Sequence, residues 1–114
     1  DARAERLTAE TVAETFAECG VVVECFDRPE EKRMLVETVL RACPKATVVA
    51  ASGLAGTADS NLIRTRRVLK RLYLVGDETH AAGPGQGLMG PRVMIAAGHQ
   101  ANAVLRLLLG EEPG

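Results

Sequence analysis

The sequence predicts an α/β domain that begins with parallel strands, continues with antiparallel strands and ends in one long helix. In the first half of the chain, helical periodicity alternates with short runs of β-branched residues, an order typical of a parallel sheet. In the second half, two short strands follow each other through a tight connection, which favours antiparallel pairing. The chain has 114 residues, the length of one domain, so residues 1–114 are expected to form a single unit.

The first helix and the first strand are expected in residues 7–19 and 21–26. Thr8 can act as the N-cap of this helix, and Gly20 can end it in the left-handed conformation. The run VVVECF that follows is almost continuously apolar and rich in β-branched residues. Such a run is typical of a parallel strand that is buried on both faces.

A second helix is expected over residues 28–43, with the sequence RPEEKRMLVETVLRAC. Asp27 and Glu30 have the spacing of a capping box, and Pro29 falls in the first turn, where its missing N–H is tolerated. The run ATVVAAS at 46–52 then predicts a second buried strand, parallel to the first.

The second half of the chain has a different pattern. After a glycine-rich turn, residues 61–68 and 71–76 predict two short strands that extend the edge of the sheet in antiparallel fashion. Residues 77–90 are rich in glycine and proline and are expected to form a loop. The last helix is expected to start at Pro91 and to be closed by Gly110.

Composition limits the classes of function. The formal net charge of −1 argues against a protein dedicated to nucleic acid or to anionic membranes. The cysteines are odd in number, lack metal-ligand spacing and fit a reducing cytoplasm. Cys25 lies inside the expected first strand and is predicted to be a buried structural cysteine. The most apolar stretch, 93–109, is interrupted by polar residues and does not have the length and composition of a membrane span.

Three stretches in register carry a resemblance to a known family. They are VVECFD followed by EEKRMLVETVL, AASGLAG with SNLIRTRR, and PGQGLMGPRVMIAAGHQANAVLRLLLG. In this order and at this spacing they resemble the C-terminal half of the ThiF family, and a bacterial thiamine-biosynthesis subgroup more closely than the MoeB type. The likeness covers essentially the whole chain.

The resemblance implies a fold, an activity and partners. The fold is Rossmann-like, with a parallel sheet that continues into antiparallel strands. The activity is that of an ATP- and magnesium-dependent adenylyltransferase. It transfers AMP to the C-terminal glycine carboxylate of a ubiquitin-like sulfur carrier protein (ThiS-like) in thiamine biosynthesis, and it releases pyrophosphate. Members usually dimerise, and a sheet that is cut from a larger fold exposes an edge, so a homodimer or self-association is expected.

Two residues are candidates for the site. Asp27 follows a parallel strand at the sheet edge where open α/β folds bind ligands. The resemblance implies that Asp27 coordinates the magnesium ion that bridges the phosphates of ATP. Lys32 lies where many relatives carry a basic residue and is a candidate for a phosphate contact. The alternatives are that Asp27 only caps the second helix and that Lys32 is a solvated helix residue.

The chain departs from the family pattern in three respects. The glycines of PGQGLMG have GxGxxG spacing at residues 85–90, but they lie in the loop before the last helix, lack a following Lys-Ser/Thr and precede Pro91, which has no amide for a phosphate. Because the chain has no such loop directly after a strand and no acidic residue to hold the ribose, the ATP-binding half is expected to lie outside this chain, which should be inactive alone. It lacks the paired CxxC ligands of many relatives, so no structural zinc is expected. The loop at 77–90 holds no cysteine, which places a persulfide step through this loop in doubt.

Other readings of the whole chain stay open. Within the superfamily, it could activate another ubiquitin-like carrier, as the MoeB type does for molybdopterin. From a different class, it could be a non-catalytic module for dimerisation and carrier binding. A metabolite-binding Rossmann-like domain would need a fingerprint loop immediately after a strand, whereas the GxGxxG spacing of residues 85–90 lies at the end of the 77–90 loop.

The two histidines and a cluster of arginines are further polar residues that need an interpretation. His80 lies in the glycine-rich loop and is a candidate for a partner contact. His99 is seven residues from both Arg92 and Arg106, so the three share one stripe of the last helix, which we expect to be its polar outer face. A basic cluster lies in the first of the two edge strands: Arg64, Arg66 and Arg67. Charge that protects a sheet edge is the main interpretation of this cluster, and contact with an acidic carrier is the alternative.

Overall fold

The computed structural model describes residues 2–77 and 90–113. In chain order, the elements are α1 (Ala9–Thr15), β1 (Val21–Val23), α2 (Pro29–Ala42), β2 (Thr47–Ala51), the short 3-10 helix η1 (Ser60–Leu62), β3 (Arg64–Leu69), β4 (Leu72–Gly76) and α3 (Gly90–Leu108). The predicted α/β class and the long C-terminal helix are confirmed. No helix in the described ranges is long and apolar enough to cross a membrane.

The sheet has four strands in the order β1-β2-β4-β3. β1 and β4 both pair with β2 in parallel, whereas β3 pairs with β4 antiparallel and forms an edge. The prediction that residues 71–76 are an antiparallel addition is therefore wrong with respect to β2, and only β3 is such an addition. The tight connection requires the two strands to be antiparallel to each other, but burial selects which one joins β2. The apolar β4 is mostly buried, and the arginine-rich β3 takes the exposed edge.

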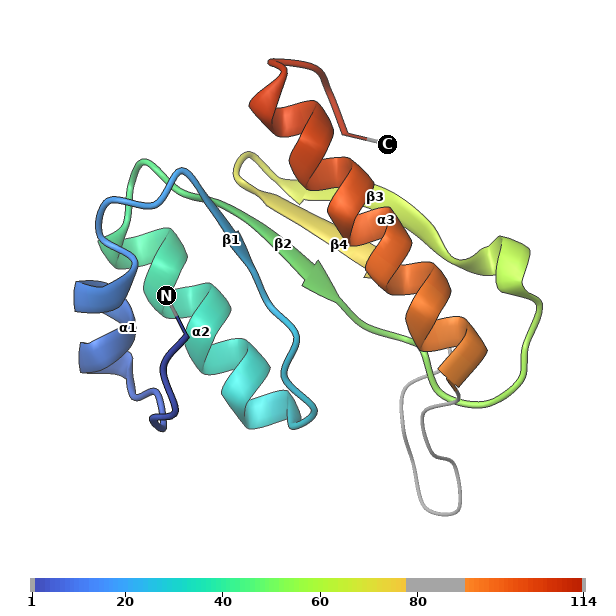
Figure 1. Ribbon diagram of the computed structural model, residues 1–114, viewed down its shortest axis with the longest axis horizontal. Coiled ribbons are helices and arrows are strands. Elements are labelled where there is room, and N and C mark those ends of the chain that lie inside the picture. The colour runs from blue at the N-terminus through green and yellow to red at the C-terminus, as the bar shows by residue number, and fades with distance from the viewer. Residues whose placement is uncertain (1, 78–89, 114) are drawn as a thin grey trace.

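Helices cover both faces of the sheet. α1 and α2 pack on one face, with Val22, Val48 and Ala50 in the same core as residues of α2. α3 packs on the other face, against Val49 and Val75. Figure 1 shows this division, with α1 and α2 beside β1 and α3 lying over β3 and β4. Neighbouring residues of β2 thus serve opposite cores, as the two-residue period of a strand requires.

The helix ends agree with the sequence in part. Thr8 is the N-cap of α1 and exchanges capping hydrogen bonds with Thr11, as expected for Thr8. The predicted end at Gly20 is wrong, because α1 stops at Thr15 and Gly20 has no positive φ. Val12 is the only buried residue of this short helix, so little packing supports its continuation.

The start of α2 and the end of α3 are likewise set by single residues at the helix ends. Arg28, and not Asp27, occupies the N-cap of α2 and makes no side-chain cap bond, so the capping box with Glu30 is a wrong prediction. Pro29 at the first helical position sets this start, because its fixed φ suits the first turn. Beyond α3, Gly110 has a φ of 74°, which confirms the predicted closing glycine.

Candidate functional site

The carboxyl ends of β1, β2 and β4 meet at one edge of the sheet, the edge where open α/β folds bind ligands. Asp27 lies there, in the link between β1 and α2 that we define as residues 24–28. Its side chain is exposed, and in the described part of the chain it makes no hydrogen bond or ion pair. The carboxylate is therefore available to a ligand, and its role with magnesium stays a prediction.

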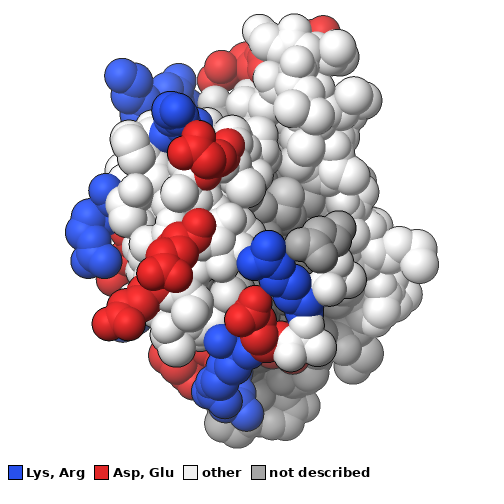
Figure 2. Space-filling view, turned by 60° about the vertical axis from the view of Figure 1, so that its left-hand side comes forward, with Lys and Arg blue, Asp and Glu red and all other residues white. Residues whose placement is uncertain are grey.

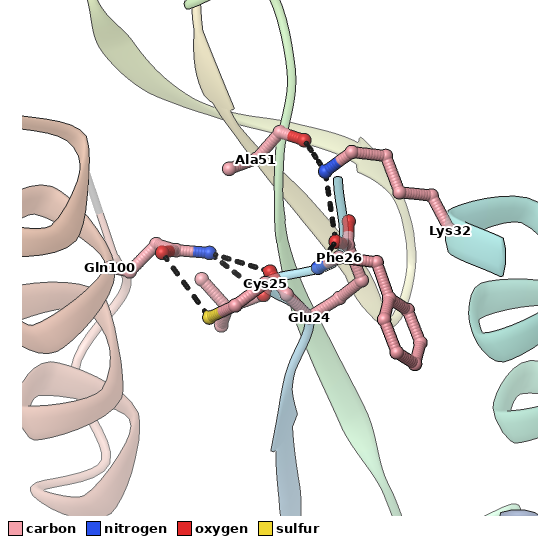
Figure 3. Close-up of polar contacts among 7 residues, drawn as sticks. Glu24, Cys25, Phe26, Lys32, Ala51 and Gln100 are labelled. Carbon is pink, nitrogen blue, oxygen red and sulfur yellow. Dashed lines mark hydrogen bonds and ion pairs between the residues drawn. The ribbon is translucent and has the colours of Figure 1, made fainter. Parts of the chain in front are cut away.

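The first residue of this link, Glu24, is a buried acid. Its side chain is only 1% exposed. One carboxylate oxygen, Oε2, accepts a hydrogen bond from the backbone N–H of Phe26 at 2.7 Å and one from Nζ of Lys32 at 2.9 Å (Figure 3). A buried charge is strongly unfavourable unless it is paired and hydrogen-bonded, and both conditions are met here.

Lys32 lies in the first turns of α2 and joins two strand ends. Besides Glu24, its Nζ donates to the backbone oxygen of Ala51, the last residue of β2, at 2.9 Å. A lysine ammonium has three N–H donors, so one remains beyond these two contacts. The side chain is 27% exposed. A phosphate contact by Lys32 stays a prediction, and it would use this third donor.

Gln100 of α3 reaches the same link from the opposite face of the sheet. Its Nε2 donates to the backbone oxygen of Glu24 at 3.1 Å and to that of Val49 at 3.4 Å. Gln100 is 7% exposed, and an amide buried to this extent requires such partners. Lys32 and Gln100 thus hold the end of β1 from two helices, as Figure 3 shows.

Cys25 does not occupy the buried position that the sequence predicted. β1 stops at Val23, so Cys25 lies in the link and is exposed, with Sγ 4.0 Å from Oε1 of Gln100. Partial burial of the thiol, followed by the negative charge of Glu24, raises the pKa of Cys25, and the ammonium of Lys32 acts in the opposite direction.

We expect Cys25 to react slowly for an exposed thiol. Alkylation requires the thiolate, so a raised pKa lowers the reactive fraction near neutral pH and moves the midpoint of the pH–rate profile upward. Mass spectrometry of the peptide that contains Cys25 measures the rate of iodoacetamide labelling at each pH. The control is the same chain in urea, where the surroundings of the thiol are lost. A folded-state midpoint equal to or below the unfolded one contradicts the expectation.

A second ion pair, in which both side chains are buried, connects the end of β4 to α3. Nη2 of Arg92 lies 2.6 Å from Oδ2 of Asp77, with side chains 5% and 1% exposed. Nη1 of Arg92 donates to the backbone oxygen of Ala55 at 3.0 Å. The pair joins the residue after β4 to the first turn of α3, and so holds a second strand end at the carboxyl edge.

Two residues of the polar stripe of α3, Arg92 and His99, face the sheet. Arg106, in contrast, is 39% exposed and pairs with Glu111 at 3.0 Å. Arg92 is buried, and Nδ1 of His99 lies 3.2 Å from Oγ1 of Thr65 on β3. The predicted polar outer face is therefore wrong for this part of the stripe. The exposed side of α3 carries instead Met94, Leu105 and Leu108, with 76%, 55% and 72% of their surface exposed. Helical spacing placed the residues on one stripe, but the buried Arg92–Asp77 ion pair and the hydrogen bond between His99 and Thr65 turned this part of the stripe toward the sheet.

The basic cluster of β3 is divided between the two sides of the strand. Arg64 and Arg66 line a hollow of about 230 Å³ together with Gly76 and Asp77. Arg67 lies at the alternate position and pairs with Glu112, 3.5 Å away. The three arginines therefore do not form one binding patch. The other candidate for a partner contact, His80, lies outside the described residues.

Sequence reasoning missed Glu24, Gln100 and the Asp77–Arg92 pair. The available signal was a charged or amide residue inside an apolar run, VVVECF for Glu24 and IAAGHQANAV for Gln100. A polar group in such a run must either reach solvent or find a buried partner.

No protein-family model, curated protein or solved structure matches the chain.

Proposed function

We propose that this chain forms part of an ATP-dependent adenylyltransferase that activates the C-terminal glycine of a ThiS-like sulfur carrier protein in thiamine biosynthesis. The proposal rests on the three stretches that resemble the ThiF family. The observation that carries it is the exposed carboxylate of Asp27 at the carboxyl edge of the parallel strands, on a link held by the ion pair between the buried Glu24 and the partly exposed Lys32. Other ligands of open α/β folds bind at this same edge.

The residues at this edge fit a magnesium ion that reaches the site with its nucleotide. Magnesium is commonly bound through one or two carboxylates together with substrate phosphates and several waters, and Asp27 supplies one carboxylate. In the described residues no three histidine, cysteine or acidic side chains converge as a metal cage. When bound, the ion would supply neutralisation of charge on the pyrophosphate. In the proposed reaction a carboxylate oxygen of the carrier attacks the α-phosphorus of ATP, and pyrophosphate leaves.

The partner is tested by titrating the ¹⁵N-labelled chain with a ThiS-like carrier. We expect shifts of amide resonances that saturate with carrier concentration. A carrier without its C-terminal glycine should bind more weakly, because the tail is the part that must reach the Asp27 edge. A molybdopterin-type carrier in a parallel titration separates the thiamine assignment from the MoeB-like alternative, since the tighter partner identifies the carrier class. Absence of binding by both carriers contradicts the proposal.

The nucleotide half of the proposal has a separate measurement. The GxGxxG spacing of this chain, at residues 85–90, does not directly follow any strand that the structure describes and precedes Pro91, which has no amide for a phosphate, so we expect Mg-ATP alone to leave the melting temperature unchanged. A ligand at 100 times its Kd would stabilise the chain by about 2.7 kcal/mol, which is readily detected. A clear shift that is lost in Asp27→Asn but kept in Glu30→Gln would mean that this chain holds more of the nucleotide site than we propose. Glu30 is a matched control because it is exposed, lies in the first turn of α2 and loses the same charge.

A non-catalytic module for dimerisation and carrier binding is the second candidate. One observation favours it: the outer side of α3 is apolar and exposed. Figure 2 shows charged side chains gathered over α1 and α2, while the opposite half of the view, toward α3, is mostly uncharged. A helix that is apolar on its outer side as well as on its inner side is usually covered.

We expect the chain to self-associate through this surface. Sedimentation velocity should show a concentration-dependent dimer, and Leu105→Glu should return it to a monomer, because a charge would then be buried at the contact. Ala42→Glu, at an exposed position on α2, introduces the same charge elsewhere and should leave the dimer intact. A monomer at all concentrations, or an equal effect of the two substitutions, argues against this surface.

A further inference from the structure

The burial of Glu24 calls for a physical explanation, because this acid lies at the carboxyl edge of the sheet and yet is only 1% exposed. Its carboxylate contacts two groups that lie further along the same chain. One is the backbone N–H of Phe26, inside the link of residues 24–28, and the other is Nζ of Lys32, in α2. The ion pair therefore joins the first residue of the link to the first turns of the helix that follows it. Asp27 lies between them.

Both partners of the ion pair, Glu24 and Lys32, are also hydrogen-bonded to the sheet. Lys32 donates to the backbone oxygen of Ala51 at 2.9 Å, which relates the start of α2 to the end of β2. The backbone N–H of Glu24 donates to Val49 at 3.0 Å, and its backbone oxygen accepts from Gln100 at 3.1 Å. The segment that carries Asp27 is thus hydrogen-bonded to β2 on either side of Asp27, through Glu24 and through Lys32. Helices α2 and α3 hold it from opposite faces of the sheet (Figure 3).

Stabilisation of the fold is a weak reason for such a pair. Taking two charges out of water offsets much of their attraction, so replacing a buried pair by uncharged groups is often neutral or stabilising. The local hydrogen bonds offer a more specific reason. The Asp27 side chain makes no hydrogen bond or ion pair in the described residues, and Arg28 is held only through its backbone oxygen, which accepts from the N–H groups of Glu31 and Lys32. Any restraint on the position of the Asp27 carboxylate must therefore come from the neighbouring residues of the chain.

We propose that Glu24 and Lys32 are positioning residues, which fix the conformation of the link and hold the Asp27 carboxylate at one place on the carboxyl edge of the sheet. The inference rests on the proposed function only for what Asp27 binds. The restraint itself belongs to this chain and is measurable without a nucleotide or a carrier. The contact of both residues with Asp27 is indirect, through the backbone.

The test uses backbone ¹⁵N relaxation of the whole chain. In the wild type, Asp27 and Arg28 should have order parameters of about 0.85, the value of rigid backbone, and in Glu24→Gln and Lys32→Met these should fall below about 0.6. The double variant Glu24→Gln/Lys32→Met should show the same loss, although it leaves no unpaired charge. Glu30→Gln, which removes an exposed charge from the same turn, should keep the wild-type values.

Circular dichroism and the melting temperature of each variant establish that it is folded. A purely stabilising pair would change the melting temperature and leave the order parameters of the folded link unchanged, and that result overturns the inference. If a single variant fails to fold, the uncharged double variant still decides the question, because it avoids the unpaired charge.

A second measurement separates this inference from the proposed function. Substoichiometric Mn²⁺, a paramagnetic substitute for magnesium, should broaden the amide signals of the link in the wild type and not in Asp27→Asn. Loss of a residue that orients a metal ligand commonly lowers affinity by about tenfold or more, and we expect this in Glu24→Gln. Mobile links in the variants without wild-type broadening at Asp27 would overturn the metal assignment and support the positioning role. Rigid links in the variants overturn the positioning role, whatever Mn²⁺ does.

Discussion

Gly76→Ala should destabilise the domain by more than about 4 kcal/mol, enough to leave much of the chain unfolded, because a small domain has only about 5–15 kcal/mol in total. Gly76 has a φ of 151°, a conformation that residues with a Cβ rarely adopt. A Cβ built there would lie 1.5 Å from the backbone oxygen of Ser52. That oxygen cannot easily withdraw, because the N–H of Ser52 is bonded to Val75 in the neighbouring strand.

The close approach joins the ends of β2 and β4, so the effect should reach the carboxyl edge of the sheet. Urea unfolding followed by circular dichroism measures the free energy of each variant. Gly98→Ala is the matched control, because Gly98 lies within α3 and an added Cβ meets nothing within 4 Å. Since alanine favours a helix over glycine by about 1 kcal/mol, this control should be neutral or slightly stabilising. Equal stability of the two alanine variants contradicts the geometry of Gly76.

Arg92→Met should reduce the free energy of unfolding by about 3–5 kcal/mol, the usual cost of removing one partner from a buried ion pair. The Asp77 side chain is 1% exposed, so its charge cannot reach water once the guanidinium is gone. The hydrogen bond from Arg92 to Ala55 is lost as well. Because the pair joins β4 to the first turn of α3, hydrogen exchange at the start of α3 should accelerate with the loss of stability.

The double variant Arg92→Met/Asp77→Asn identifies the cause of that loss. It removes both charges, so it should recover part of the stability that the single substitution removes. The coupling between the two sites comes from the four free energies of the cycle, measured by urea unfolding. If the double variant is as unstable as the sum of its parts, the ion pair is not the reason. An exposed pair offers a reference: removing Lys45, paired with Glu18 at 3.7 Å, should change stability by less than about 1 kcal/mol.

Local signals in the sequence predicted the class of fold, the order of most elements and several helix ends. Thr8 caps α1, Pro29 begins α2 and Gly110 closes α3, because each effect depends on the backbone preference of one residue and its near neighbours. The buried strand β2 was likewise visible as a run of apolar residues. The place of Asp27 after a parallel strand predicted that it lies at the carboxyl edge of the sheet, the edge where open α/β folds bind ligands. Its metal and the carrier protein stay proposals.

Other features depended on contacts between residues far apart in the chain. A tight connection predicted two antiparallel strands, but the choice of β4 as the neighbour of β2 came from burying its apolar side chains. The seven-residue spacing of α3 placed Arg92 and His99 on one stripe, but their partners Asp77 and Thr65 turned that stripe toward the sheet. Neither partner can be identified from the helix alone.

Sequence patterns alone predicted an α/β chain with an acidic residue after its first parallel strand. Only the packed fold shows that Glu24 is buried, that Lys32 and Gln100 hold it from opposite faces, and that Asp27 stays exposed beside it. Helix caps and strand runs could be predicted because they are set by short-range backbone preferences. The placement of a buried charge depends on which distant groups can satisfy it, and only the packed fold brings those groups together.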